Sequence, residues 1–274
     1  MHDLHTHSVC SDGSLRPEAL VSRAKEKGVT VLALTDHDTT AGLNEARQAA
    51  EQLDITLING IEFSCLWNGI GIHIVGLNFD PQHPQMVSAE KHQTQSRDER
   101  AELIDQRLSK VGIHGSLDGA RRLSGGGVIG RPHFAQFLIE QGHVSSMNAA
   151  FKRYLGAGKP GDVKQMWPSV EQVVEWICAA GGTAVVAHPD KYKMTRTKLR
   201  RLLDDFIEAG GQSMEIVSGN QQPNTTRDLR LIADQKELYG SCGSDFHVPD
   251  QPWQELGRYS PMPQDLPAVW ELWS

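Results

Sequence analysis

The stretch that decides the fold is Leu-His-Thr-His at residues 4–7, followed by Ser-Asp-Gly-Ser at residues 11–14. Side chains of an extended segment alternate between its two faces, so His5 and His7 point the same way. Two imidazoles on one face at the end of a strand suit a divalent metal ion, and the carboxylate of Asp12 lies in the same short stretch. The alternative is a polar N-terminus with incidental histidines. The choice between these two interpretations depends on the rest of the sequence.

The composition restricts the kind of partner. The chain has 274 residues, enough for one large α/β domain or one domain with a subdomain. Acidic residues outnumber basic ones by 34 to 27, and the net charge of −7 argues against stable binding to duplex DNA through bulk positive charge. A local basic pocket or a metal centre would still bind phosphate.

The cysteines and the N-terminus indicate a cytoplasmic protein. The four cysteines are widely spaced and form no CxxC pair, so neither a zinc ribbon nor a disulfide framework is expected. The N-terminus lacks the basic and apolar regions of a signal peptide, and no run of about 18 apolar residues would span a membrane. The sequence does not predict the oligomeric state.

Strand and helix patterns alternate over most of the chain, which predicts a parallel sheet or barrel with its chemistry at the carboxyl ends of the strands. Ser14 is the expected cap of the first helix, whose first turn holds Pro17, and a helix containing Trp270 and Trp273 is expected at the end of the chain. The other expected helices are 42–53, 170–180, 199–209 and 225–235. The expected strands are 29–35, 55–61, 70–77, 183–187, 213–217 and 238–243.

The alternation of strand and helix patterns stops between residues 81 and 168. Residues 86–111 and 132–142 read as helices, and a glycine run at 125–127 separates them. We therefore expect a helical insertion at 81–168 that caps the active site, within a barrel built from residues 1–80 and 169–274.

Nine residues able to bind a metal fall near the predicted strand ends. A single histidine there is more often structural, but parallel topology gathers such ends around one axis. The set is rich in imidazole and carboxylate and lacks thiolate, which favours manganese, with iron or zinc as alternatives. Nine ligands are too many for one ion, so two or three divalent ions that activate water and clamp a phosphoryl group are expected. The nine are His5, His7, Asp12, His37, Glu62, His73, His188, Asp245 and His247.

The motifs resemble, in order, those of the PHP (polymerase and histidinol phosphatase) superfamily. The resemblance implies a distorted seven-stranded (β/α) barrel with a trinuclear phosphoesterase centre. The motifs that carry it are His-Thr-His with Ser-Asp-Gly, Thr-Asp-His-Asp at 35–38, Gly-Ile-Glu at 60–62, the lone His73, Ala-His-Pro at 187–189 and Gly-Ser-Asp-Phe-His at 243–247.

The resemblance also assigns the ligands. The first ion falls to His5, His7, Glu62 and Asp245, the second to Glu62, His73 and His188, and the third to Asp12, His37 and His247. Relatives that act on histidinol phosphate usually have a histidine where this chain has Asp12. The third site is therefore either weaker, or Asp12 is free to protonate the leaving oxygen. Asp12 and His247 are the candidate catalytic residues.

The insertion resembles that of the YciV/TrpH subgroup, in Gly-Arg-Pro-His-Phe-Ala at 130–135 and Gly-Lys-Pro-Gly at 158–161. This implies a phosphatase of nucleoside 3′,5′-bisphosphates that also trims short 5′-phosphorylated RNA. Arg131 and His133 are the candidate 5′-phosphate ligands, with Lys159 and Asn220 as weaker ones. Alternatively, Arg131 pairs with a carboxylate, Lys159 is merely solvated and Asn220 caps a helix.

Three other functions stay open. One is another small-molecule phosphatase of the histidinol-phosphate kind. A second is an amidohydrolase, although such barrels usually bridge two ions with a carbamylated lysine where this chain has Glu62. The third is a nucleotide-binding regulatory module without activity, which would be expected to have lost ligands.

Overall fold

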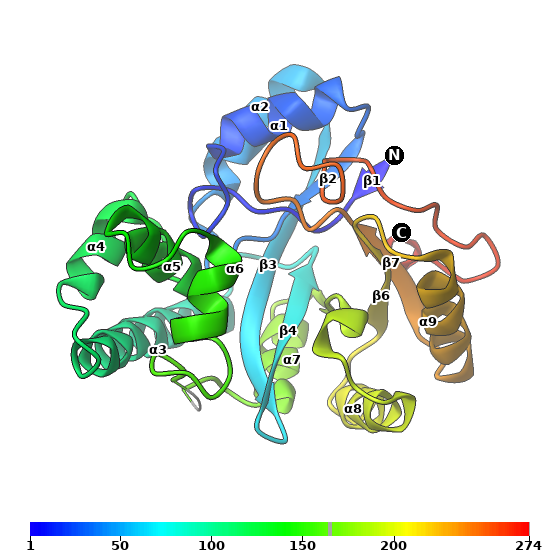
Figure 1. Cartoon of the computed structure of the whole chain (residues 1–274). Coiled ribbons are helices and arrows are strands. Elements are labelled where there is room, and N and C mark those ends of the chain that lie inside the picture. The colour runs from blue at the N-terminus through cyan, green and yellow to red at the C-terminus, as the bar shows by residue number, and fades with distance from the viewer. Residues whose placement is uncertain (164–165, 274) are drawn as a thin grey trace.

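A single sheet of seven strands, in the order β1 to β7, forms the centre of the molecule in this computed structural model, which describes residues 1–163 and 166–273 (Figure 1). The sheet closes where the N-terminal segment meets β7: the backbone N–H of Leu4 donates to Cys242 over 3.1 Å and that of His7 to Phe246 over 2.9 Å. This confirms the distorted seven-stranded α/β barrel. The strands are β1 (His2–Asp3), β2 (Val31–Leu34), β3 (Thr56–Trp67), β4 (Ile70–Leu77), β5 (Thr183–Val186), β6 (Ser213–Ser218) and β7 (Tyr239–Gly243).

The expectation of an all-parallel sheet is wrong at β4, which runs antiparallel to both β3 and β5. The cause is the Asn68-Gly69 pair, whose φ angles of 48° and 72° make a two-residue turn between β3 and β4. Such a turn fits the twist of a hairpin. β3 therefore continues to Trp67, past its predicted end, and Glu62 and His73 lie within paired strands and not at strand ends.

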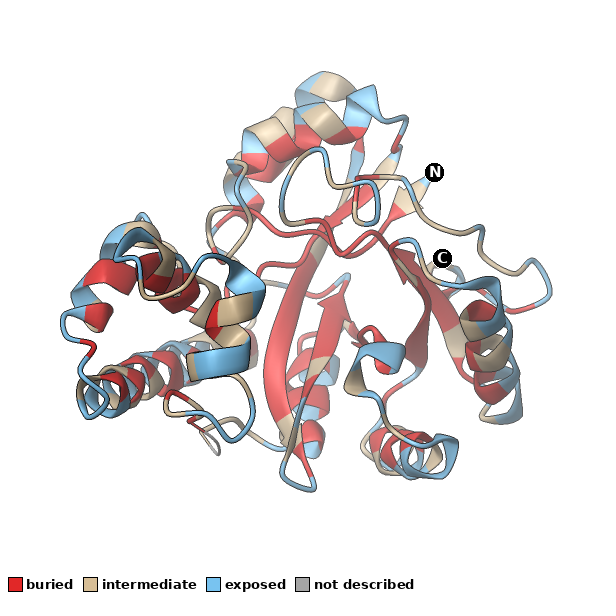
Figure 2. Ribbon diagram, viewed as in Figure 1, coloured by how far each residue is buried: buried red, intermediate tan, exposed pale blue. Residues whose placement is uncertain are grey.

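Helices cover the outside of the barrel with their apolar faces turned inward, as the buried positions in Figure 2 show. Ser14 does not cap the first of them. The cap position is Arg16, Pro17 is the first helical residue, and the Ser14 hydroxyl donates to the carbonyl of His247 over 3.2 Å. The helices are α1 (Pro17–Glu26), α2 (Leu43–Leu53), α7 (Val170–Ala179), α8 (Arg196–Glu208) and α9 (Pro223–Gln235).

The end of the chain forms only a short 3₁₀ helix, Val269–Trp273, in place of the expected helix. Trp270 stacks on His2 with the ring centroids 3.9 Å apart, so it packs against the first strand. No helix among the described residues is long and apolar enough to cross a membrane.

The helices of the segment at 81–168 gather beside β3 and β4 (Figure 1). They have a hydrophobic core of their own, to which Ile104, Leu108, Phe134 and Leu138 contribute. The boundaries of this segment as a separate insertion stay a prediction. Its helices are α3 (Pro84–Ser109), α4 (Ser116–Leu123), α5 (Arg131–Glu140) and α6 (Met147–Ala150), followed by a π-helical turn, Phe151–Leu155.

Candidate metal centre and adjoining cavity

His5 and His7 lie side by side at the closure of the barrel, both fully buried. Their Nε2 atoms are 3.1 Å apart, and each lies 3.2 Å from Oε2 of Glu62. Oδ1 of Asp245 lies 3.6 Å from Nε2 of His5 and 3.4 Å from Nε2 of His7. Gly243 makes this approach possible, because a Cβ atom there would lie 2.5 Å from Cβ of His5.

Glu62 lies at the centre of the site and contacts residues from three further segments. Its Oε1 is 2.8 Å from Nδ1 of His73 and 2.9 Å from Nε2 of His188, while Oε2 is 3.0 Å from Nδ1 of His37. A carboxylate with both oxygens so placed suits a ligand that bridges two ions.

Asp12 and His247 complete the cluster on another side. Oδ1 of Asp12 is 3.3 Å from Nε2 of His247, and Oδ2 is 3.7 Å from Nε2 of His37. All nine predicted ligands thus meet in four overlapping groups, within each of which the ligand atoms lie within 4.8 Å of one another. These groups are His7-Asp12-His37-His247, His5-His7-Asp245, His5-Glu62-His188 and His37-Glu62-His73.

The chemistry of these donors fits divalent ions. Several buried ligand atoms have no hydrogen-bond partner, a costly state that metal coordination would relieve. Although burial alone would raise the pKa of Asp12, the imidazoles of His37 and His247 hold it well below its ordinary value. Burial lowers the pKa of His7, but Asp245 and Glu62 raise it to about 10. The atoms of the cluster that make no hydrogen bond, despite the short contacts given above, are Nδ1 of His7, Oδ1 of Asp12, Nδ1 of His37, Oε2 of Glu62 and Nδ1 of His188.

Glu215, on β6, is a residue that the sequence reasoning missed. Its Oε1 lies 2.6 Å from Nδ1 of His5, and its Oε2 accepts the backbone N–H of His188 over 2.6 Å. A carboxylate on Nδ1 fixes the imidazole tautomer whose Nε2 lone pair faces the cluster. The available signal was a single charged residue, a glutamate, inside the otherwise uncharged strand at 213–217.

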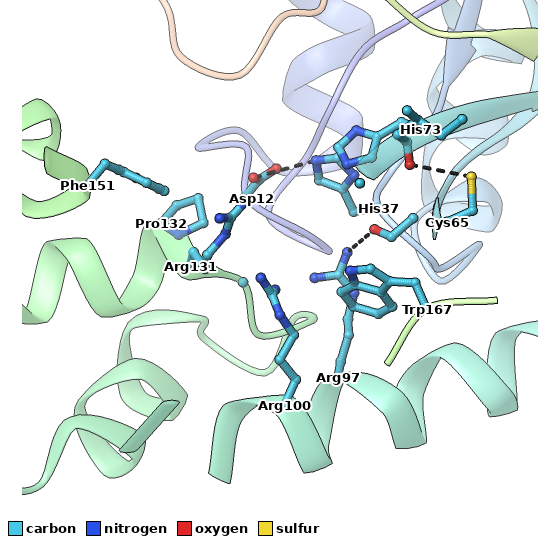
Figure 3. A pocket seen from close by; sticks show the side chains of 14 residues that line it. Asp12, His37, Cys65, His73, Arg97, Arg100, Arg131, Pro132, Phe151 and Trp167 are labelled. Atoms are coloured by element: carbon cyan, nitrogen blue, oxygen red, sulfur yellow. Dashed lines mark hydrogen bonds and ion pairs between the residues drawn. The ribbon is translucent and has the colours of Figure 1, made fainter. Parts of the chain in front are cut away.

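A cavity of about 210 Å³ opens directly beside the cluster (Figure 3). Asp12, His37 and His73 line it on the barrel side. The opposite wall comes from the helical segment and contains three arginines and two aromatic rings. These residues are Arg97, Arg100, Arg131, Phe151 and Trp167.

The three arginines differ in their partners. Arg97 is neutralised by Asp38, whose Oδ2 accepts from its Nε over 2.8 Å. Arg100 and Arg131, within the described ranges, have no carboxylate within 4.0 Å; Arg100 lies over the ring of Trp167 at 5.2 Å and donates to the carbonyl of Val163 at 3.4 Å. Burial, followed by the nearby charges of Arg131 and Arg97, lowers the pKa of Arg100 to about 9. Half-buried cations without an ion-pair partner within 4.0 Å among the described residues are suited to binding an anion.

Of the four predicted phosphate ligands, only Arg131 lines this cavity. His133 is buried, and its Nδ1 accepts the backbone N–H of Gly130 over 3.0 Å, so it fixes the start of α5. Lys159 and Asn220 are exposed. Asn220 does not cap α9, whose cap position is Gln222.

Arg97, Arg100 and Trp167 had not been singled out from the sequence. The two arginines are three residues apart on α3 and therefore share one helix face. This spacing could have indicated a basic surface on that helix.

A seven-stranded barrel with a cluster of imidazoles and carboxylates at its mouth defines a metal-dependent hydrolase. The model of the PHP domain matches residues 3–216, and the chain belongs to the PHP domain family. The PHP phosphoesterases are metal-dependent, and the family match therefore agrees with the candidate ligand groups.

Several curated relatives match along nearly their whole length. The 5′-3′ exoribonuclease Rnm of Escherichia coli K12 is 47% identical over 100% of this chain and 94% of its own. The 5′-3′ exoribonuclease of Haemophilus influenzae is 46% identical over 98% of both chains. The 3′,5′-nucleoside bisphosphate phosphatase of Chromobacterium violaceum is 42% identical over 98% of this chain and 94% of its own.

Solved structures of similar fold also match nearly the whole chain. One, named an amidohydrolase from Chromobacterium violaceum with bound sulfate and no metal, superposes with a TM-score of 0.92 at 42% identity, covering 98% of this chain and 94% of that chain. Another, from Bifidobacterium adolescentis and named as a metal-dependent phosphoesterase, gives a TM-score of 0.81 at 27% identity, covering 97% of this chain and 92% of that chain.

Proposed function

We propose that this chain is a metal-dependent phosphoesterase that converts nucleoside 3′,5′-bisphosphates, such as pAp, to the 5′-monophosphate and phosphate, and that trims short 5′-phosphorylated RNA from its 5′ end. The observation that carries the proposal is the arginine-lined cavity, which adjoins the metal cluster through Asp12, His37 and His73. Relatives at 42% to 47% identity carry names for both activities.

Glu62 would be the ligand shared between two ions, as the resemblance implies. His5, His7 and Asp245, whose ligand atoms lie close together, would complete the first set. Bound ions of this kind lower the pKa of water and clamp phosphoryl oxygens. Manganese is the proposed metal, with iron or zinc as alternatives, because imidazole and carboxylate donors suit all three.

The same bond breaks in both substrates. Water adds its oxygen to the 3′-phosphorus, the P–O3′ bond breaks, and O3′ takes up a proton. With the bisphosphate the products are a nucleoside 5′-monophosphate and phosphate. With RNA they are a nucleoside 5′-monophosphate and a chain one nucleotide shorter that again carries a 5′-phosphate.

Arg131 and Arg100 are proposed to hold the 5′-phosphate of the terminal nucleotide. Their guanidinium groups are fixed against Phe151 and Trp167, with 5.6 Å and 5.2 Å between the guanidinium carbon and the ring centroid. A rigid fork of donors binds phosphate with little further loss of freedom. Anchoring this end in the cavity places the 3′-phosphate over the cluster and accounts for cleavage from the 5′ end.

His247 is the proposed proton donor to O3′ in a centre of two ions, in which the third ligand set of Asp12, His37 and His247 binds no metal. Burial lowers its pKa, as does His7, but the carboxylate of Asp12 raises it above the ordinary value. The neighbouring imidazoles of His37 and His247 hold the pKa of Asp12 well below its ordinary value, so its carboxylate is suited to orienting His247.

The alternatives receive less support. Glu62 takes the bridging position that a lysine holds in many amidohydrolases, and all nine ligands are brought together, unlike in a degenerate binding module. We propose a cytoplasmic enzyme, and leave its oligomeric state open.

The test is phosphate release from a panel with manganese, magnesium and zinc: pAp, 3′-AMP, histidinol phosphate and 5′-phosphorylated oligoribonucleotides. Manganese-dependent turnover of pAp and stepwise shortening of RNA are expected. In addition, Arg131→Met should raise KM for pAp about tenfold or more, and change KM for p-nitrophenyl phosphate less than twofold. No release from pAp or RNA with any metal would overturn the proposed function, and equal effects on both esters would overturn the assignment of Arg131.

A further inference from the structure

Tyr192 connects two of the segments that carry candidate metal ligands. It is the last residue of the 3₁₀ turn Pro189–Tyr192, which directly follows His188. Its hydroxyl accepts the backbone N–H of His73 on β4 over 2.8 Å and donates to the carbonyl of the same residue over 3.4 Å. Tyr192 therefore bonds both polar backbone groups of a candidate ligand, and the chemistry proposed above assigns it no role.

The hydroxyl of Tyr192 takes the place of a bond of the sheet. His73 and Ala187 face each other one residue beyond the last pair of the antiparallel strands β4 and β5. Opposite residues that bond in such a ladder normally exchange two hydrogen bonds. Here the backbone N–H of Ala187 donates to the carbonyl of His73 over 3.1 Å, but the N–H of His73 donates to Tyr192. The phenol thus supplies the second bond at the point where β5 has ended, at Val186.

The other end of the same turn carries a strained residue. His188 has a φ of 28° and a ψ of 59°, a backbone conformation that a residue with a side chain rarely adopts and keeps only when its surroundings hold it. Its backbone N–H is held by Glu215, as described above. Its imidazole is contacted by the ring of Tyr192, edge to face, with 5.5 Å between the centroids and an angle of 63° between the planes. Tyr192 therefore contacts the side chain of one candidate ligand and the backbone of another.

These two histidines belong to the same candidate ion, here called the second ion, whose third ligand is Glu62. Oε1 of Glu62 lies 2.8 Å from Nδ1 of His73 and 2.9 Å from Nε2 of His188. The two imidazoles lie nearly at right angles, with 5.3 Å between their centroids. Among the described residues, no hydrogen bond or ring contact joins Tyr192 to the other members of the first set, which are His5, His7 and Asp245. Its contacts are therefore confined to the second ion.

We propose that Tyr192 is a positioning residue for the second ion. Its hydroxyl fixes the backbone of His73 and its ring fixes the imidazole of His188, so that both imidazoles face Glu62 at once. Contacts behind the ligands of a metal typically change its affinity by about 10- to 100-fold. The inference rests on the proposed metal-dependent function and deepens it, because it makes the occupancy of one ion depend on one phenol.

The test is isothermal titration of the metal-free full-length protein with manganese. The wild-type protein should bind manganese in at least two steps. Tyr192→Phe removes the hydroxyl and keeps the ring, and it should weaken one step about tenfold or more while changing the affinity of the other less than twofold. A residue that only packs the turn would lower the Tm of the metal-free protein and leave both affinities as they are.

Two further variants identify the step and control for the substitution. His73→Ala removes a ligand of the second ion alone, so the step that it abolishes is the step that Tyr192→Phe should weaken. Tyr239→Phe is the matched control, because Tyr239 is also half-buried but lies at the start of β7, away from the end that leads to Asp245. It should change neither affinity.

The outcomes separate this role from the proposed function. Unchanged manganese affinities in Tyr192→Phe, or an equal weakening of both steps, would overturn the positioning role and leave the phosphoesterase intact. A wild-type protein that binds two ions but releases no phosphate from pAp or RNA would overturn the proposed function, while a selective loss in Tyr192→Phe would still support the positioning role. If the wild-type protein binds fewer than two ions, the centre of two ions fails and the role of Tyr192 fails with it.

Discussion

Glu215 lies 2.6 Å from Nδ1 of His5, although 210 residues separate the two in the chain. The contact joins β6 to the N-terminal motif and aims Nε2 of the imidazole at the cluster. Glu215 is not a candidate ligand itself, but it positions one.

Glu215→Gln should therefore weaken manganese binding by about 10- to 100-fold, as loss of a carboxylate behind a ligating histidine typically does. The amide removes the charge and cannot accept from both His5 and the backbone of His188. Isothermal titration with manganese checks this. Glu208→Gln, at an exposed position on α8, serves as the control, and an unchanged affinity in the Glu215 variant would contradict the positioning role.

Metal removal should destabilise the protein. The cluster holds several buried donors without partners, and a ligand present at 100 times its Kd stabilises the folded state by about 2.7 kcal/mol. For a chain of this size, that corresponds to roughly 5–10 °C in Tm. Thermal unfolding with manganese and with a chelator measures the difference, which should largely disappear in Glu62→Gln. Equal Tm values for the wild-type protein would argue against bound metal.

Arg100 should contribute to 5′-phosphate binding as strongly as Arg131. Arg100→Met is expected to raise KM for pAp about tenfold and to leave 3′-AMP, which lacks the 5′-phosphate, nearly unaffected. Arg121→Met, at an exposed position on α4, is the control for loss of a positive charge. The measurement is KM for each of the two nucleotides from steady-state kinetics. An equal rise in KM for pAp and for 3′-AMP would contradict the assignment of Arg100 to the phosphate site.

Asp38 should be a stability residue that ties the helical segment to the barrel. It accepts from Arg97 Nε over 2.8 Å and from the backbone of Ser64 over 2.7 Å. Asp38→Ala leaves the buried Arg97 without a counter-charge and should cost about 3–5 kcal/mol in the free energy of unfolding. Urea denaturation measures this. Adding Arg97→Met should recover part of the loss, and a double variant as unstable as the sum of both singles would speak against the pair.

The sequence predicted the barrel and the metal candidates because both follow local rules. Apolar runs such as residues 183–187 are typical of buried strands, and the polar motifs follow most of them. The reversed β4 was missed although Asn68-Gly69 is a hairpin signal, because the run at 70–77 was read by its apolar character alone.

The supporting residues were harder to predict because their partners are distant in sequence. Nothing near Glu215 points to His5, and nothing near Arg100 points to Trp167. Such pairs arise only when the sheet closes and α3 packs beside the barrel. Lys159 and Asn220 were the weaker phosphate candidates in the sequence; both are exposed, and neither lines the arginine cavity.

The central claim is that side chains from the whole length of the chain bind a cluster of divalent ions at one barrel mouth. The most direct measurement is an anomalous difference map from manganese-soaked crystals, recorded at the manganese edge. We predict peaks at two or three positions around Glu62, including one between His5, His7 and Asp245. A map without a peak within coordination distance of Glu62 would contradict the account.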